Sequence, residues 1–174
     1  MEFLSTQINA VEQFLAAGGP VLSFILLVSI CLWCLIIERL LFFRLSYPAL
    51  RRAWLEQWQQ RADKCSLHAR HIRSGIISEA KITMNKTVPI IKMLVNICPL
   101  LGLLGTVNGM IHVFDVMAVT GSGNARAMAD GVSQATIPTM AGMVIAIAGL
   151  YFSKLIEERV SDETHHLTDL LQNH

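Results

Sequence analysis

Threonine side chains occur within two uncharged, mostly apolar stretches of the sequence, residues 93–114 and 131–153. Each stretch is long enough to cross a bilayer as a helix, which takes about 20 mostly apolar residues. Thr106, Thr136 and Thr139 place hydroxyl groups in hydrocarbon, which costs free energy unless another helix or water satisfies them. Hydroxyls can order a chain of water molecules but do not titrate at useful pH. The pattern therefore indicates helices that face protein or a water-filled path.

A stripe of small residues follows one face of each stretch. In the first, Gly102, Thr106 and Gly109 fall within one turn-width, and Gly105 begins a G-x-x-x-G pattern that permits close helix contact. The second stripe consists of Ala135, Thr139, Gly142, Ala146 and Ser153. Because each stripe carries a threonine, the two stripes together favour a pore lining. For each hydroxyl alone, a hydrogen bond to a carbonyl of its own helix is the alternative.

A proline within the second stretch frees a backbone acceptor. Pro138 has no N–H to donate to the carbonyl of Gln134, one turn earlier. That carbonyl lies next to Thr136 and Thr139, so a local cluster of oxygen atoms is expected within the membrane. We therefore group Gln134 and Thr136 with Thr106 and Thr139 as a predicted pore lining.

A second polar stripe occurs in the first stretch. Asn108, His112 and Asp115 are spaced four and three residues apart, and the spacing puts them on one helix face, nearly opposite the small residues. Two interpretations stay open. The stripe is a secondary polar path for ions, or it marks the exit of the helix toward polar loop contacts.

Composition and charge place the whole chain in a membrane. Of the 174 residues, 53% are hydrophobic and 16% are charged, the net charge is +1, and the charges are confined to blocks. A third apolar stretch, 21–37, is expected to stay as a helix, since no signal-peptide cleavage site follows it. Eleven of the fourteen Lys and Arg residues lie in 39–92 and none in 1–38. The N-terminus should therefore lie outside, with 44–92 and the C-terminus in the cytoplasm.

The expected fold class is an all-α membrane protein with three transmembrane helices and long cytoplasmic helical extensions. Pro48 and the Ser74–Gly75 pair are expected to interrupt the helical pattern of the large cytoplasmic segment. The expected segments are an outer amphipathic helix at 1–17, a first span at 18–43, a cytoplasmic helical segment at 44–92, a second span at 93–118, a short periplasmic loop at 119–129, a third span at 130–153 and a cytoplasmic helical tail at 154–174.

Several other groups favour structural roles. Glu38 and Arg39 meet at a membrane edge, where an ion pair is favoured over proton handling. Cys31 and Cys34 form a C-x-x-C within an apolar span, and small apolar fillers are the simpler interpretation. A spacing of three between two histidines, 68 and 71, suits a metal, but without further ligands nearby no metal or other cofactor is expected.

The composition also excludes some classes of function. Positive-inside bias accounts for the basic block, so a nucleic-acid partner is not expected. The spans hold no nucleophile–base pair or metal triad, so the chain is not expected to be an enzyme. The expected partners are the lipid bilayer and other membrane proteins.

Two motifs carry a resemblance to a known family. The segment PLLGLLGTVNGM at 99–110 and the segment GVSQATIPTMAG at 131–142 resemble the second-span and third-span signatures of the ExbB/TolQ/MotA family. Members of that family energise bacterial inner-membrane motors with the proton-motive force. Three spans make the chain more similar to ExbB than to MotA, whose members have four.

The resemblance implies an assembly and a division of labour. Five copies would form a ring around a central pore that holds the single helices of two ExbD-like or TolR-like subunits. Thr106 and Thr139 match the family's pore threonines, while Gln134 stands where many ExbB and TolQ members have a glutamate. Since glutamine cannot carry a proton as a carboxylate does, the resemblance assigns the titrating group to the partner's intramembrane aspartate.

The resulting function is a proton-channel subunit of a bacterial inner membrane that energises a TonB-like protein for siderophore or vitamin import. The alternatives are a TolQ-like subunit that maintains the envelope, and a scaffold that only oligomerises without conducting. The scaffold alternative predicts that valine at 106 or 139 preserves function, because packing volume is kept.

Overall fold

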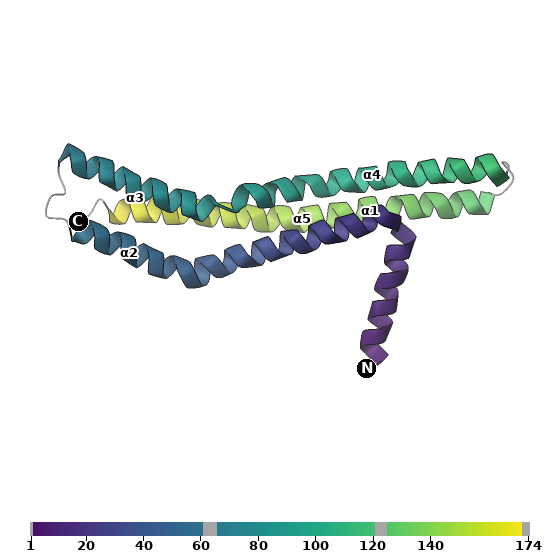
Figure 1. Ribbon diagram of the computed structural model, residues 1–174, viewed down its shortest axis with the longest axis horizontal. Helices are drawn as coiled ribbons and strands as arrows, with labels where there is room; N and C mark the ends of the chain where they lie inside the picture. Colours follow the sequence, from purple (N-terminus) through teal and green to yellow (C-terminus); the bar gives the residue numbers. More distant parts are fainter. Residues whose placement is uncertain (1, 61–65, 121–124, 172–174) are drawn as a thin grey trace. The chain divides into compact units, whose positions relative to one another are not determined.

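The structure is a computed structural model that describes residues 2–60, 66–120 and 125–171. The side chains of residues 2–18, 120, 125–127 and 130 lie outside the description. All the regular elements of the described part are helices (Figure 1). They are α1 (Glu2–Leu41), a short π-helical turn (Phe42–Ser46), α2 (Tyr47–Gln59), α3 (Leu67–Asn85), α4 (Val88–Thr120) and α5 (Ala125–Leu170).

Helix α1 changes direction sharply at Gly19 (Figure 1). Gly19 has φ +66° and ψ −166°, a conformation that glycine adopts freely because it lacks a Cβ. Pro20 follows it and has no N–H to continue the hydrogen-bond ladder. The break lies at the boundary that the sequence predicts between residues 1–17 and the first apolar stretch.

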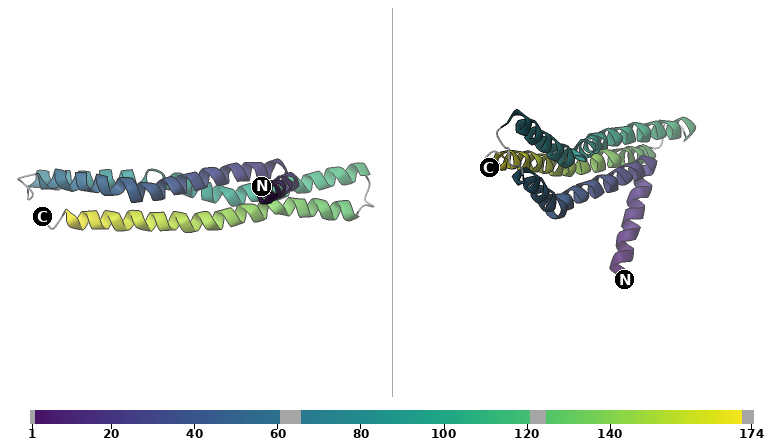
Figure 2. Two further views of the ribbon diagram at one scale, coloured as in Figure 1. Left: turned by 90° about the horizontal axis from the view of Figure 1, so that it is seen from below. Right: turned by 60° about the vertical axis from the view of Figure 1, so that its left-hand side comes forward.

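By its contacts the chain divides into two compact units, of which the first contains Met1–Leu32 and Met93–Gly149. In this unit α4 and α5 run side by side (Figures 1 and 2). Its core is apolar, with large outward side chains exposed as for helices in lipid. Buried residues include Leu22, Ile25, Leu32, Val95, Cys98, Ala135 and Ala146. Exposed residues include Phe24, Leu27, Leu100, Leu104, Met140 and Ile147.

The second unit contains Trp33–Lys92 and Leu150–His174. Its core holds aromatic and aliphatic side chains, including Ile36, Trp54, Trp58, Ile76, Met84, Ile156, Val160 and Leu167. The side chain of Arg39 is only 3% exposed here, and its Nη2 donates to the carbonyl oxygens of Thr83, at 2.6 Å, and of Met84. These carbonyls end α3, where helical acceptors lack intrahelical donors. Arg39 thus caps the C-terminal end of α3.

Of the two interruptions that the sequence predicts in the segment 44–92, a helix boundary does occur at Pro48, and the one at Ser74 and Gly75 does not occur. Pro48 lies in the first turn of α2, where proline is tolerated because that N–H has no helical partner. Ser74 and Gly75 lie inside α3, where the Ser74 hydroxyl donates to the carbonyl of His71. Among the described residues, the helices are also interrupted by the π-helical turn at Phe42–Ser46 and by a bend at Lys86 and Thr87, and α2 ends at Gln59 before α3 begins at Leu67.

Helices α4 and α5 are longer than the stretches predicted to span the membrane. Helix α5 continues without interruption to Leu170, past the apolar stretch that ends at 153. At its other end, residues 125–129 are helical, although the sequence predicts them within a loop. Within the described residues, three helical stretches are long and apolar enough to cross a membrane: Gly19–Gln59, Leu67–Val119 and Gly131–Leu170.

Candidate functional site

The two motif-bearing helices touch through their backbones. A Cβ on Gly102 would lie 2.9 Å from the Cα of Thr139, and a Cβ on Gly142 would lie 2.6 Å from the carbonyl oxygen of Cys98. A Cβ on Gly109 would lie 2.7 Å from the Cα of Ala135. Only glycine fits at such positions, and small residues at helix contacts are how membrane helices approach closely. We call this contact the α4–α5 seam.

The hydroxyl of Thr139 joins the two helices across the seam. Its Oγ1 donates to the carbonyl oxygen of Gly102 at 2.7 Å. This is an interhelical bond, whereas the sequence alone left a bond within the helix as the alternative. Thr139 is therefore half-buried in the helix contact.

The other two threonines, Thr106 and Thr136, each donate to a carbonyl of their own helix, which is the alternative to a pore-facing hydroxyl. Thr106 Oγ1 donates to the carbonyl of Leu103 at 2.7 Å, and Thr136 Oγ1 donates to the carbonyl of Ser133 at 2.8 Å. Both bonds are exposed on the surface of the unit. Because a hydroxyl oxygen retains acceptor capacity after donating, both groups can still bind water or a partner.

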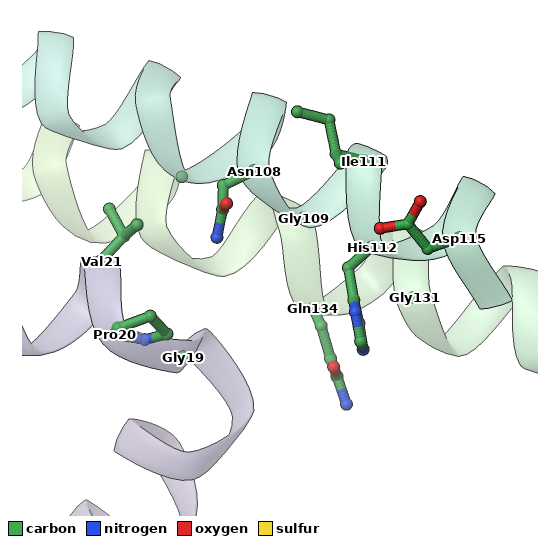
Figure 3. Close-up of a pocket in the computed structure, with 11 residues that line it drawn as sticks. Gly19, Pro20, Val21, Asn108, Gly109, Ile111, His112, Asp115, Gly131 and Gln134 are labelled. Carbon is green, nitrogen blue, oxygen red and sulfur yellow. The ribbon is translucent and has the colours of Figure 1, made fainter.

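An open cavity of about 410 Å³, with exposed polar side chains among apolar ones, lies on another side of the seam. Its walls come from the α1 turn at Gly19–Pro20, from α4 and from α5 (Figure 3). Asn108, His112 and Gln134 point to the same side, and Asp115 follows one turn after His112 (Figure 3). Gly105, Gly109 and Gly131 also line the cavity.

Four of the candidate site residues line this cavity: Asn108, His112, Asp115 and Gln134. Gln134 lies with Asn108, His112 and Asp115, whereas the sequence predicts it among the pore threonines. The polar stripe also reaches the edge of the glycine face, since Gly105 and Gly109 line the same cavity. Along a helix each residue turns by about 100°, so Thr106 and Asn108 face different directions.

Two glycines outside the predicted site shape this cavity. Gly131 packs against Val113, where a Cβ would overlap the valine side chain, and Gly19 forms the turn of α1. The signals for both are present in the sequence. Gly131 is four residues before Ala135 on the small-residue face, and Gly19 precedes a proline.

The remaining predicted residues lie elsewhere. Arg39 has carbonyl partners on α3 and the rings of Phe42 and Phe43, whose centroids lie 4.5 and 5.5 Å from its Cζ, while Glu38 is exposed. In the described parts of the chain, no group of three or more His, Cys, Asp or Glu residues is placed to hold a metal ion.

Comparison with known proteins decides the family. The sequence profile of the MotA/TolQ/ExbB proton channel family matches residues 48–169, which include the α4–α5 seam and the cavity-lining residues of both helices. The chain belongs to this family. With three helices able to cross a bilayer, this family member is a multi-pass membrane protein.

Individual relatives match shorter regions. A biopolymer transport protein exbB1 of Vibrio cholerae is 36% identical over 94 residues, which cover 52% of this chain and 41% of that protein. An ExbB-like biopolymer transport protein of Synechocystis is 39% identical over 64 residues, covering 36% of this chain and 30% of that protein. An ExbB homologue of Methanothermobacter thermautotrophicus is 31% identical over 80 residues, covering 46% and 28%. The chain spans less than half the length of these curated relatives.

Proposed function

We propose that this family member is the ExbB-like subunit of a proton-driven motor. With an ExbD-like partner it uses the proton-motive force to energise a TonB-like protein for nutrient import across the outer membrane. The observation that supports this most is the α4–α5 seam. The segments at 99–110 and 131–142 pack backbone to backbone, with Thr139 bonded to Gly102.

The proposed channel forms from several copies in an inner membrane, with the N-terminus outside and the C-terminus in the cytoplasm. Exposed apolar side chains on α4 and α5 supply surfaces that neighbouring copies and lipid can cover. We propose five copies around the partner's helices, which is the assembly that the family resemblance implies.

In this proposal the chain orders water and the partner carries the proton. Thr106 and Thr136 keep acceptor capacity on the surface of the unit, next to the seam. None of the three threonine hydroxyls titrates at useful pH, and the Gln134 amide does not either. A carboxyl group of the ExbD-like partner would bind and release the proton between the ordered waters.

Thr106→Val tests the channel role at the smallest structural cost. The substitution keeps side-chain volume, and the lost hydrogen bond lies within one helix. In a strain that depends on this gene for growth on siderophore-bound iron, we expect Thr106→Val to abolish uptake while Thr106→Ser retains it. Both variants should insert and assemble equally. Full uptake with Thr106→Val would overturn the proposal and favour the scaffold alternative.

Growth tests of the same strain distinguish a TonB-type role from a TolQ-like role. A TonB-type role predicts loss of siderophore uptake with normal resistance to detergents. Detergent sensitivity with normal uptake would overturn the TonB assignment in favour of a TolQ-like role in envelope maintenance.

A further inference from the structure

A second open cavity, of about 450 Å³, lies within the second unit of the chain. One wall comes from the end of α1 and the π-helical turn, and the other comes from α5. None of its residues belongs to the threonine side or to the cavity beside the α1 turn, so the proposed function leaves it unused. The lining side chains are Leu40, Phe43, Arg44, Ile156, Arg159 and Glu163.

The apolar part of this lining is held in place by buried neighbours. Ile156 belongs to the core of the unit and is only 1% exposed. The ring centroid of Phe43 lies 5.5 Å from Cζ of Arg39 and 5.9 Å from the ring centroid of Tyr47. Arg39 and Tyr47 are themselves buried. An apolar floor is therefore present before any ligand binds.

Two guanidinium groups give the cavity a net positive charge. Arg44 comes from the π-helical turn and Arg159 from α5, and both side chains are exposed. Neither takes part in the ion pairs found among the described residues, which join α4 to α5 or lie along α5. Glu163 contributes the one negative charge of the lining, and its Oε2 is buried. The cavity therefore favours an anion.

Both arginines lie within reach of the phospholipid headgroups. Arg44 is the first residue after the predicted first span, 18–43, and Arg159 lies six residues after the third, 130–153. Six residues extend about 9 Å along a helix. The headgroup layer on each side of a bilayer is about 5–8 Å thick. Long basic side chains reach back toward that layer while their stems cover apolar surface.

We propose that this cavity binds the headgroup of an anionic phospholipid on the cytoplasmic side of the membrane. The two guanidinium groups bind the phosphate from two different helices, because their planar donor forks match phosphate oxygens. Leu40, Phe43 and Ile156 contact the glycerol and the first acyl carbons. Basic pockets between membrane helices on this side are typical sites for anionic lipids. The bound lipid joins the π-helical turn to α5.

Native mass spectrometry of the full chain in detergent micelles tests the site, because it resolves lipids bound to the protein. Dioleoyl phosphatidylglycerol is the anionic probe. Dioleoyl phosphatidylcholine, which has the same acyl chains and no net charge, is the control lipid. We expect phosphatidylglycerol to bind at least about tenfold more tightly, since each basic residue near an anionic lipid contributes about fivefold in affinity.

Replacing the two arginines should remove this preference. We expect Arg44→Gln and Arg159→Gln each to weaken phosphatidylglycerol binding about fivefold and to leave phosphatidylcholine binding unchanged. The two changes together should make the affinities for the two lipids equal. The matched control combines Arg52→Gln with Arg70→Gln, which removes the same charge at exposed arginines outside the cavity and should keep the preference. If the double cavity variant fails to insert, the single variants decide.

A bulky side chain distinguishes a cavity site from diffuse surface charge. Leu40→Trp fills part of the cavity with both arginines in place, and we expect it to weaken phosphatidylglycerol binding at least about fivefold. Leu41→Trp is the control, because Leu41 is the next residue of α1 and is 49% exposed but does not line this cavity. It should leave the affinity unchanged.

Three results would overturn the proposal: equal affinity of the native chain for the two lipids, equal losses in the cavity and control arginine variants, or equal effects of the two tryptophans. If the arginines instead bind acidic side chains of another copy, their replacement should reduce the number of associated chains and leave the lipid preference intact, which would also overturn it. These measurements need neither an ExbD-like partner nor nutrient uptake, so they stand whether or not the proposed function does.

Discussion

The hydroxyl of Thr139 donates a 2.7 Å hydrogen bond to the carbonyl oxygen of Gly102 across the α4–α5 seam. The bond requires the close approach that glycine permits, since a Cβ on Gly102 would lie 2.9 Å from the Cα of Thr139. The two positions therefore depend on each other. This threonine has a structural role in the seam, which Thr106 does not share.

Removing this hydroxyl should weaken the fold. We expect Thr139→Val to lower the free energy of unfolding in mixed detergent micelles by about 1 kcal/mol, the usual value for an interhelical hydrogen bond in a membrane protein. Thr139→Ser keeps the hydroxyl and should lose less. Equal losses for the two variants would show that packing of the methyl group, rather than the hydrogen bond, stabilises the seam.

Two glycine-to-alanine replacements should distinguish a steric clash at the α4–α5 seam from the gain in helix propensity that alanine brings. We expect Gly142→Ala to destabilise the protein by about 1–3 kcal/mol, because the new Cβ meets the carbonyl oxygen of Cys98 at 2.6 Å and the backbone must move. Gly75→Ala is the matched control, since its Cβ would meet nothing within 4 Å. It should stabilise α3 by up to about 1 kcal/mol. Thermal unfolding of both variants measures the difference, and a stabilising Gly142→Ala would contradict the tight seam.

Loss of the Arg39 guanidinium should loosen the end of α3. Arg39→Met keeps much of the side-chain volume but removes the donors to the carbonyls of Thr83 and Met84. We expect a loss of about 1.5–3 kcal/mol in unfolding free energy, because hydrogen bonds from charged groups are strong when buried. Amide hydrogen exchange should also rise at the bend of Lys86 and Thr87. Arg52→Met, at an exposed arginine, is the control, and similar exchange in both variants would refute the capping role.

An ion pair between α4 and α5 should make stability depend weakly on pH. Lys92 Nζ lies 2.7 Å from Glu157 Oε1, and this hydrogen bond lowers the pKa of the Glu157 carboxyl. A lowered folded-state pKa stabilises the fold above the unfolded pKa, about 4.3 for glutamate, and this contribution is lost as the pH falls through the folded value.

The effect should be small, because the two side chains are 47% and 43% exposed and solvent screens them. Compared with the native protein, Lys92→Met should therefore lose less than about 1 kcal/mol at pH 7 and almost nothing at pH 3. Chemical unfolding at low and high salt checks this, with exposed Lys81→Met as the control. A difference that grows toward low pH would have the wrong sign.

Hydropathy alone predicts the long apolar helices, because a bilayer permits few other structures for such segments. The glycine spacing likewise predicts close contact of α4 with another helix. The side on which Gln134 lies could not be predicted. It is one residue before Ala135, about 100° around α5 from the contact face, so its neighbours depend on the sense in which the two helices pack.

Local sequence signals mark some interruptions of the helices and mislead at another. Ser74 and Gly75 carry the composition of a helix break, yet α3 continues through them. The bend occurs instead after Asn85, next to the carbonyls that Arg39 caps. Pro89, in the first turn of α4, has no N–H to donate to the carbonyl of Asn85, so a local signal does mark this bend. Arg39 from α1 adds a long-range contact to the carbonyls beside it.

The proton-channel role is tested most directly by proton flux in sealed proteoliposomes. The chain is reconstituted with its ExbD-like partner, a potential is imposed, and an entrapped pH dye reports proton entry. We expect flux with the native chain and with Thr106→Ser, and none with Thr106→Val in complexes of the same size and composition. Equal flux with Thr106→Val, or no flux with the native complex, would contradict the account.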